Sequence, residues 1–326
     1  MSGKIAVVGA GAWGTALAAS VVRAGWSCLL LGRDSETAAK INELHRNPRY
    51  LGEIELPETL RMTLEPAEAL AGAEIVLVAV PAQTVSSALP GLAAFAAPGS
   101  VFVSCAKGID RETGRTMSGL MATLVGNDRA AVLSGPSFAI DVAAGLPTAV
   151  TVAASDIKTA KMLAESLSNP VLRCYASDDI PGVELGGALK NVLAIAAGIV
   201  HGRQLGASAL AALTTRGFAE LRRVAAALGG RPETLVGLSG LGDLILTCGS
   251  EKSRNFAYGA AIGRGAPLDE LALAEGVKTA AMAARIAREH GVEAPIIAAV
   301  DAVLDGGLSV EAAIDRLMSR PLKTET

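Results

Sequence analysis

A single lysine, Lys190, interrupts an otherwise apolar and small-residue segment, 183–200, which reads VELGGALKNVLAIAAGIV. On a helix its neighbours one turn away include Gly186 and Gly187, so the surface around its side chain carries little bulk. Each glycine costs about 1 kcal/mol relative to alanine inside a helix, so tight packing or a ligand must offset that cost. The amine could act as a general acid or base, or it could bury only its stem and reach water.

A glycine-rich turn near the N-terminus has the composition of a dinucleotide-binding loop. The sequence GAGAWG, residues 9–14, follows an apolar run, precedes helix-forming residues, and has a second apolar run at the spacing of a βαβ unit. In such a loop Gly9 permits the tight turn, Gly11 lets the backbone approach a pyrophosphate, and Gly14 allows close helix packing. The cofactor contacts predicted here are Gly9, Gly11, Ala12, Trp13 and Gly14.

The end of the second predicted strand, Leu31-Gly32-Arg33-Asp34, bears on the choice of cofactor. A guanidinium at Arg33 can pair with a 2′-phosphate, which favours NADP, whereas Asp34 leaves NAD open. Arg33 could instead be a solvent-facing residue at the start of a helix. We predict NADP or NAD as the cofactor, with NADPH preferred.

Residues beyond two further strands could also meet a ligand, because open α/β sheets bind ligands past the carboxyl ends of their strands. Lys107 could bring an ammonium to the nicotinamide or to an anionic substrate, or it could be a surface lysine. Ser137 follows a strand and a Gly-Pro turn, where it could equally cap a helix.

The segment GSEKSRN, residues 249–255, precedes a helical pattern and combines a hydroxyl, a guanidinium and free backbone N–H groups. That combination favours a phosphate, although a helix start with a serine cap would look the same. Asp243 could likewise be only the N-cap of a helix over 244–247, and Glu275 could be a surface carboxylate.

The elements that position these residues fall into two halves. Up to about residue 176, short β-rich runs alternate with helical patterns, which is typical of a parallel sheet covered on both faces. Beyond that point the sequence becomes helix after helix, broken at glycine pairs and triplets. We predict a Rossmann-type domain over 1–177, with a mostly parallel doubly wound sheet, and an all-α domain over 178–326. Strands are expected at 5–8, 28–31, 75–80, 101–105, 131–133 and 148–153, helices at 15–24, 36–44, 84–93 and 116–124, and glycine breaks at 229–230, 240–242, 263–265 and 306–307.

Composition excludes several classes of function. The 326 residues are 51% hydrophobic, but no run approaches the roughly 20 uninterrupted apolar residues of a membrane span. The N-terminus lacks the pattern of a signal peptide, so we expect a cytoplasmic protein. Four cysteines without a CxxC pair and three histidines indicate neither a disulfide framework nor a metal site. A net charge of -3 and 3% aromatic residues argue against nucleic acid, which leaves a small-molecule partner.

Six motifs in order then show a resemblance to bacterial NAD(P)-dependent glycerol-3-phosphate dehydrogenases that runs through nearly the whole chain. They are GAGAWGTALA, AKGIDRETG, LSGPSFAIDVAAGLPTAV, GVELGGALKNVLAIAAGI, GLGDLILTCGSEKSRN and AEGVKT. The resemblance implies that Lys190 is the proton donor and acceptor and that Asp243 positions this lysine and the substrate. It also implies substrate contacts at Lys107, Gly135, Ser137, Ser253, Arg254 and Asn255, cofactor contacts at Lys107, Ala139, Arg254 and Glu275, and a homodimer.

The implied reaction is the reversible, NAD(P)H-dependent reduction of dihydroxyacetone phosphate to sn-glycerol 3-phosphate, which supplies glycerophospholipid synthesis. A β-hydroxyacid or 6-phosphogluconate-type dehydrogenase shares the same plan and a helix-borne lysine, although the SRN and GLGD motifs argue against it. A module that senses nicotinamide nucleotides without catalysis is the alternative from another class.

Overall fold

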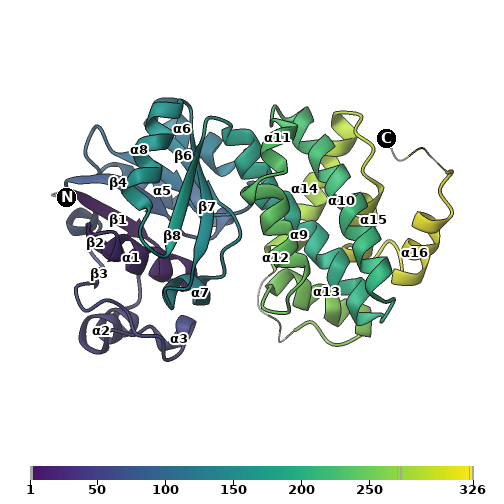
Figure 1. Cartoon of the computed structure of the whole chain (residues 1–326), viewed down its shortest axis with the longest axis horizontal. Coiled ribbons are helices and arrows are strands. Elements are labelled where there is room, and N and C mark those ends of the chain that lie inside the picture. Colours follow the sequence, from purple (N-terminus) through teal and green to yellow (C-terminus); the bar gives the residue numbers. More distant parts are fainter. Residues whose placement is uncertain (1–2, 270, 272–273, 323, 325–326) are drawn as a thin grey trace. The chain divides into compact units, whose positions relative to one another are not determined.

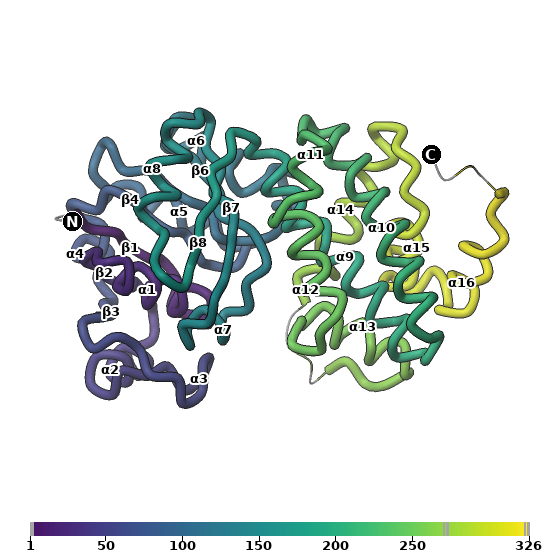
Figure 2. Tube along the Cα trace, viewed as in Figure 1, coloured from purple at the N-terminus to yellow at the C-terminus, as the bar shows by residue number. Residues whose placement is uncertain are grey.

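The computed structural model describes residues 3–269, 271, 274–322 and 324. The chain divides into two compact units, Met1–Glu184 and Leu185–Thr326, whereas the sequence placed the division between residues 177 and 178. The chain completes the first unit before it enters the second (Figure 2). The two units are therefore described separately.

The first unit contains an eight-stranded sheet in the order β3-β2-β1-β4-β5-β6-β7-β8 (Figure 1). Neighbouring strands are parallel except β6 and β7, which are antiparallel. The predicted fold, a mostly parallel doubly wound sheet, is confirmed. The strands are β1 (Lys4–Val8), β2 (Ser27–Leu31), β3 (Arg61–Thr63), β4 (Ala73–Val78), β5 (Val101–Ser104), β6 (Ala130–Ser134), β7 (Thr148–Ala154) and β8 (Leu172–Ser177).

Helices cover both faces of this sheet, which explains why its strands are apolar without alternation. In β1, Ile5 and Val7 belong to one hydrophobic core cluster, while Ala6 and Val8 belong to another. The first cluster includes residues of α1, α2 and α8, and the second includes residues of α4, α5 and α6. The helices of this unit are α1 (Ala12–Arg23), α2 (Ser35–Leu44), α3 (Pro48–Leu51), α4 (Pro66–Leu70), α5 (Val85–Ala93), α6 (Met117–Val125), α7 (Ala139–Ala143) and α8 (Ile157–Leu167), with short 3₁₀ turns at Ala82–Thr84 and Asn127–Arg129.

All six predicted strands form, but the sequence analysis missed β3 and β8. Strand β3 has only three residues, and β8 reads LRCYAS, in which only the first residue is fully buried. Both lie at the edges of the sheet, so neither carries the continuous apolar run that identified the other strands. Strand β4 also ends at Val78, two residues before the predicted end.

The second unit is helical, as predicted, and begins within α9 (Ile180–Gly202). Glycines let neighbouring helices approach α9 closely: a Cβ at Gly198 would overlap the Phe256 carbonyl oxygen, and a Cβ at Gly259 would overlap the Ile195 carbonyl oxygen. The remaining helices are α10 (Ala207–Ala227), α11 (Pro232–Leu235), α12 (Asp243–Cys248), α13 (Arg254–Arg264), α14 (Glu275–Glu289), α15 (Pro295–Leu304) and α16 (Val310–Met318).

One predicted helix break is wrong. Residues 240–242 belong to a π-helical turn, Leu238–Gly242, that leads directly into α12. The Gly242 amide donates to the Gly237 carbonyl at 3.1 Å, which is the i→i+5 bond of that turn. The glycines here widen a helix rather than end it, whereas those at 229–230, 263–265 and 306–307 do separate helices.

Helix α9 has the length and hydropathy of a membrane span by composition alone, and the described residues contain one such helix. All of its 18-residue apolar window is buried inside the structure, which is the usual environment of a core helix.

Candidate active site

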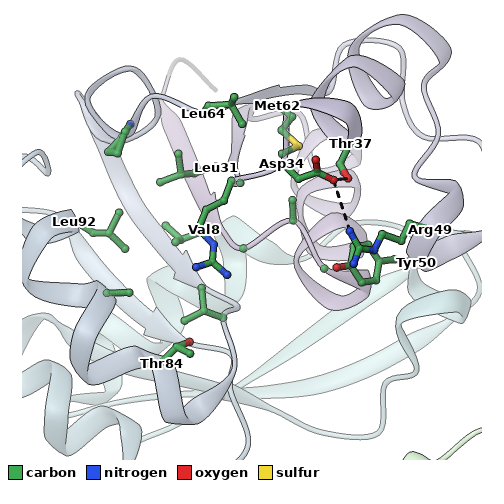
Figure 3. Close-up of a pocket in the computed structure, with 18 of the residues that line it drawn as sticks. Val8, Leu31, Asp34, Thr37, Arg49, Tyr50, Met62, Leu64, Thr84 and Leu92 are labelled. Atoms are coloured by element: carbon green, nitrogen blue, oxygen red, sulfur yellow. Dashed lines mark hydrogen bonds and ion pairs between the residues drawn. The ribbon is translucent and has the colours of Figure 1, made fainter. Parts of the chain in front are cut away.

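A cavity of about 700 Å³ in the first unit opens where β1, β2 and β4 end (Figure 3). Gly9, Ala10 and Gly11 line it after β1, and Arg33 and Asp34 line it after β2. This edge of a parallel sheet is where open α/β folds bind ligands. Two of the regions that the sequence assigned to the cofactor therefore share one cavity.

The geometry of the glycine loop fits a dinucleotide. Gly9 has φ +110°, a backbone conformation that favours glycine, and a Cβ at Gly14 would overlap the Gly9 carbonyl oxygen. At Gly11, by contrast, nothing lies within 4 Å of where a Cβ would project. This open space lets a ligand reach the backbone beside the N-terminus of α1, where unpaired N–H groups favour phosphate. Ala12 and Trp13 form the first turn of that helix, and both are partly buried against the core.

An asparagine that the sequence analysis missed supports this loop. The Asn47 side-chain amide donates to the Ala10 carbonyl at 3.2 Å and to the Thr15 hydroxyl at 2.9 Å. Asn47 is 1% exposed and precedes the short helix α3. It thus ties the α2–α3 segment to the loop from 32 residues away in the sequence. No local pattern marks such a contact.

The Asp34 carboxylate is engaged in local bonds, although 46% of its side chain is exposed. Its oxygens accept from the Glu36 amide at 3.2 Å and the Thr37 hydroxyl at 2.5 Å, and the Arg49 guanidinium lies 3.8 Å away (Figure 3). The Thr37 hydrogen bond, aided by Arg49, lowers the pKa of Asp34. Asp34 is thus the N-cap of α2, and Arg33, which is exposed and lines the cavity, precedes the helix. Arg49 also lines the cavity, although the sequence analysis did not single it out.

Three predicted substrate contacts meet around one carbonyl at the ends of β5 and β6. The Lys107 ammonium donates to the Gly135 carbonyl at 2.9 Å, and the Ser137 hydroxyl donates to the same oxygen at 3.1 Å. The reading of Ser137 as a helix N-cap is wrong, because the N-cap of α7 is Phe138. Ala139, a predicted cofactor contact, is the first residue of α7 and is partly buried.

In the helical unit, Lys190 is buried and paired. Its ammonium donates to the Asp243 carboxylate and, at 2.7 Å, to the Thr247 hydroxyl. The Lys190 side chain is 6% exposed and that of Asp243 1%, so a lysine whose head reaches water is excluded. The reading of Asp243 as an N-cap is also wrong, because α12 begins at Asp243 after Gly242. Thr247 was missed, although it lies one helical turn beyond Asp243.

Packing of glycine backbone brings the two helices of this pair together. A Cβ at Gly186 would lie 2.8 Å from the Ser239 carbonyl oxygen, in the π-helical turn before Asp243. The space beside Gly186 therefore holds the protein's own backbone, so of the two explanations offered for this glycine, tight packing is right and a ligand against it is wrong. Burial raises the pKa of the neighbouring Cys248 thiol to about 12, so this sulfur stays protonated beside Lys190.

The segment over 253–255 forms the start of α13. Ser253 is its N-cap and accepts from the Phe256 amide at 3.3 Å, so the serine-cap reading is right about this side chain. The exposed Arg254 and the buried Asn255 are the first two helical residues. The side-chain amide oxygen of Asn255 accepts from the Gly276 backbone amide at 2.8 Å, which joins α13 to the start of α14, where Glu275 is partly buried.

A nucleotide-binding sheet unit followed by a helical unit with a buried lysine–aspartate pair defines the class of nicotinamide-dependent dehydrogenases. Comparison with known families narrows this class. The family described as NAD-dependent glycerol-3-phosphate dehydrogenase matches over both of its parts, the N-terminus at residues 4–160 and the C-terminus at residues 179–315. The chain belongs to this family.

Individual relatives agree along the whole chain. The glycerol-3-phosphate dehydrogenase (NAD(P)+) of Brucella canis is 55% identical over 325 residues, covering 100% of both proteins, and that of a Chelativorans strain is 58% identical, covering 98% of both. The crystal structure of glycerol-3-phosphate dehydrogenase from Coxiella burnetii superposes with a TM-score of 0.91 at 36% identity, covering 98% of this chain and 99% of that one. A D-mandelate dehydrogenase, at 17% identity and a TM-score of 0.64, shares the fold alone.

Proposed function

We propose that this protein catalyses the reversible, NAD(P)H-dependent reduction of dihydroxyacetone phosphate to sn-glycerol 3-phosphate. The observation that carries the proposal is the buried Lys190–Asp243–Thr247 cluster in a chain that matches both parts of this family. The cavity of the first unit would hold NAD(P)H, which would supply the hydride to the carbonyl carbon.

Lys190 acts as the general acid. Hydride addition makes the carbonyl oxygen an alkoxide, which the ammonium protonates; in the reverse direction the neutral amine takes the hydroxyl proton. Asp243 holds the lysine by charge and hydrogen bond, and Thr247 fixes its direction. Because both partners are buried with Lys190, water competes little for the proton.

The start of α13 binds the substrate phosphate. Arg254 is exposed and has no hydrogen bond among the described residues, so its guanidinium is available to an anion. The Asn255 side chain uses its oxygen on Gly276, which leaves its amide N–H₂ for phosphate oxygens. The first N–H groups of the helix add their partial positive charge. The Ser253 hydroxyl is already used as the cap, so its contribution is to shape this turn.

The remaining predicted contacts stay proposals of the same kind. Lys107, Gly135 and Ser137 meet at one carbonyl and would position the substrate, while Ala139 and Glu275, each at the start of a helix, would contact the cofactor.

Two observations support NADPH as the preferred cofactor. The Asp34 carboxylate caps α2 and faces Arg49, so it is poorly placed to accept hydrogen bonds from ribose hydroxyls. Arg33 and Arg49 both line the cavity and can pair with a 2′-phosphate. The homodimer and the supply of glycerophospholipid synthesis remain predictions from the resemblance, and the cytoplasmic location remains a prediction from the N-terminal sequence.

The direct test mixes the pure protein with dihydroxyacetone phosphate and NADPH or NADH and follows nicotinamide absorbance. We expect turnover with both and a higher kcat/KM with NADPH. Arg33→Gln and Arg49→Gln should each lower the NADPH/NADH ratio by about tenfold, the effect of one charge-assisted hydrogen bond. Arg46→Gln is the matched control, since Arg46 pairs with Glu53 and Glu55 at 2.8 and 2.7 Å and does not line the cavity.

Other results would overturn the proposal. Cofactor binding without loss of absorbance would indicate a nucleotide sensor, and faster oxidation of a β-hydroxyacid would indicate the rival dehydrogenase class. Equal use of both nucleotides by wild type and both variants would contradict only the assignment of Arg33 and Arg49 to the 2′-phosphate, and not the proposed reaction.

Substrate binding is tested with Arg254→Ala. Because phosphate binding also aligns the carbonyl for reaction, this variant should raise KM and lower kcat together. Arg264→Ala changes an exposed arginine at the other end of the same helix and should leave both constants unchanged. An unaltered KM in Arg254→Ala would contradict the assignment of the phosphate-binding site to the start of α13.

A further inference from the structure

A second cavity, of about 240 Å³, lies entirely within the helical unit. Residues of α14, α15 and α16 line it, together with the short connection over 292–294. None of its lining residues belongs to the proposed catalytic cluster or to the phosphate segment of α13. The proposed reaction therefore gives this cavity no role.

The floor of this cavity is apolar. Ala284 and Ala287 of α14 line it with Ala298 and Ala299 of α15, and Leu317 of α16 adds a larger apolar side chain. Among the described residues, the lining contains no serine, threonine, asparagine, glutamine, histidine or tyrosine. A sugar or polyol would find few partners for its hydroxyl groups here, so the floor selects an apolar group.

The charged residues of the lining are three arginines and one glutamate. Arg320 is paired with Glu293, whose backbone carbonyl also accepts from Arg223 at 2.9 Å. Arg288 and Arg316 are exposed, and neither guanidinium forms a hydrogen bond or an ion pair within 4 Å among the described residues. Arg288 interacts electrostatically with Asp301, whose pKa is raised by burial and lowered in part by Arg288. The cavity thus has two guanidiniums without a hydrogen-bonded partner above an apolar floor.

We propose that this cavity binds an amphiphilic carboxylate. A guanidinium matches a carboxylate geometrically through two parallel N–H···O bonds, so Arg288 and Arg316 are suited to the head group. The alanine floor would receive the aliphatic chain, whose removal from water adds affinity. The volume of about 240 Å³ admits a short aliphatic chain, for which octanoate is a suitable probe.

The test is a calorimetric titration of the full-length protein with octanoate, in low salt and with saturating NADPH so that the cofactor cavity is filled. We expect saturable binding of one octanoate per chain that weakens as salt is added. Acetate, which has the head group without the chain, and octanol, which has the chain without the charge, should each bind at least tenfold more weakly.

Variants locate the site. Arg288→Gln and Arg316→Gln should each weaken octanoate binding about tenfold or more, as expected for loss of a charge-assisted pair. Ala298→Glu places a carboxylate on the exposed part of the floor and should abolish binding without disturbing the buried core. Arg285→Gln is the matched control on α14, because Arg285 does not line the cavity and lies 3.6 Å from Glu289.

The proposal fails if wild-type protein does not bind octanoate, if acetate or octanol binds as tightly, or if the three cavity variants bind like wild type. These measurements need no turnover, so they stand apart from the test of the proposed reaction.

Discussion

The helical unit buries charge at two places that differ in how the charge is satisfied. Lys190 on α9 meets an opposite charge, Asp243, and a hydroxyl, Thr247. Glu220 on α10 forms its hydrogen bonds with backbone: its carboxylate accepts from the Ile296 amide at 2.9 and 3.0 Å and from the Ile297 amide at 3.1 Å, while Arg223 and Arg320 act on it by charge. Both residues are 5% exposed or less. Burial alone therefore does not distinguish them.

The partners indicate different roles. The amides that bind Glu220 are in the first turn of α15, so this carboxylate anchors a helix end and its bonds require only an acceptor. The partners of Lys190 are side chains of one helical turn, held against α9 by the packing at Gly186. An opposite charge keeps an amine protonated and oriented, which is what a proton donor needs. We expect Lys190 to control turnover and Glu220 to control stability.

The largest effect should come from Lys190→Ala. Removing a general acid costs roughly 10²–10⁴-fold in rate, so turnover should nearly disappear while NADPH binding stays intact. Lys161→Ala, an exposed lysine on α8, is the control. Because Asp243 loses its partner, the double variant Lys190→Met/Asp243→Asn should be assayed in parallel by circular dichroism and turnover. Wild-type-like kcat in either variant would end the assignment.

Asp243→Asn separates charge from position and should have the next largest effect. The amide keeps the shape of the side chain but removes the charge opposite Lys190, and breaking a buried ion pair commonly costs about 3–5 kcal/mol of stability. We expect a lower urea midpoint and a kcat reduced by roughly 10²-fold. A lower urea midpoint with unchanged kcat would show that the Lys190–Asp243 pair serves stability alone. It would then not differ in role from Glu220.

The glycine loop and the family of the chain could be read from the sequence because their constraints are local. Gly9, Gly11 and Gly14 lie within one six-residue loop, and each is needed there for a reason that concerns the local backbone. The structure shows the tight turn at Gly9, the open approach at Gly11 and the close packing at Gly14. Strands that are buried under helices on both faces are likewise predicted by continuous apolar runs in the sequence.

Contacts between distant segments could not be read in this way. Lys190 and Asp243 are 53 residues apart, so the sequence marked both residues but left a snorkelling lysine and a helix cap open. Asn47 is the N-cap of the four-residue helix α3 and Arg49 lies within it, a helix too short for a periodic pattern, and their contacts to the loop and to Asp34 exist only in the folded unit. The break expected at 240–242 was wrong because glycine also permits the i→i+5 turn that carries Asp243.

Thr247→Val should have a smaller effect on turnover. Valine has nearly the same shape but cannot accept the hydrogen bond from the Lys190 ammonium at 2.7 Å. Loss of one such bond to a charged group corresponds to roughly tenfold in kcat. Thr247→Ser keeps the hydroxyl and is the matched control. Equal turnover in the valine and serine variants would show that Asp243 alone orients the lysine.

Glu220→Gln should leave turnover unchanged and alter only the pH dependence of stability. Burial raises the pKa of Glu220 from 4.5 to about 7, against the lowering effect of the Ile296 and Ile297 amides and of Arg223. Because the folded pKa exceeds the unfolded one, the contribution of this group is fully present below pH 4.5 and is lost as pH rises to about 7. The loss amounts to about 3 kcal/mol at most.

Glutamine keeps one oxygen to accept from the α15 amides but does not titrate, so its stability should be flatter over this range than that of wild type. Urea unfolding at pH 5, 6, 7 and 8 measures the difference between the two curves, and it should widen between pH 5 and 7 and then stay constant. Parallel curves would place the folded pKa of Glu220 near its ordinary value, with the backbone amides outweighing burial. Glu220 would then be a stably ionised helix anchor, and the contrast with Lys190 would rest on their hydrogen-bond partners alone.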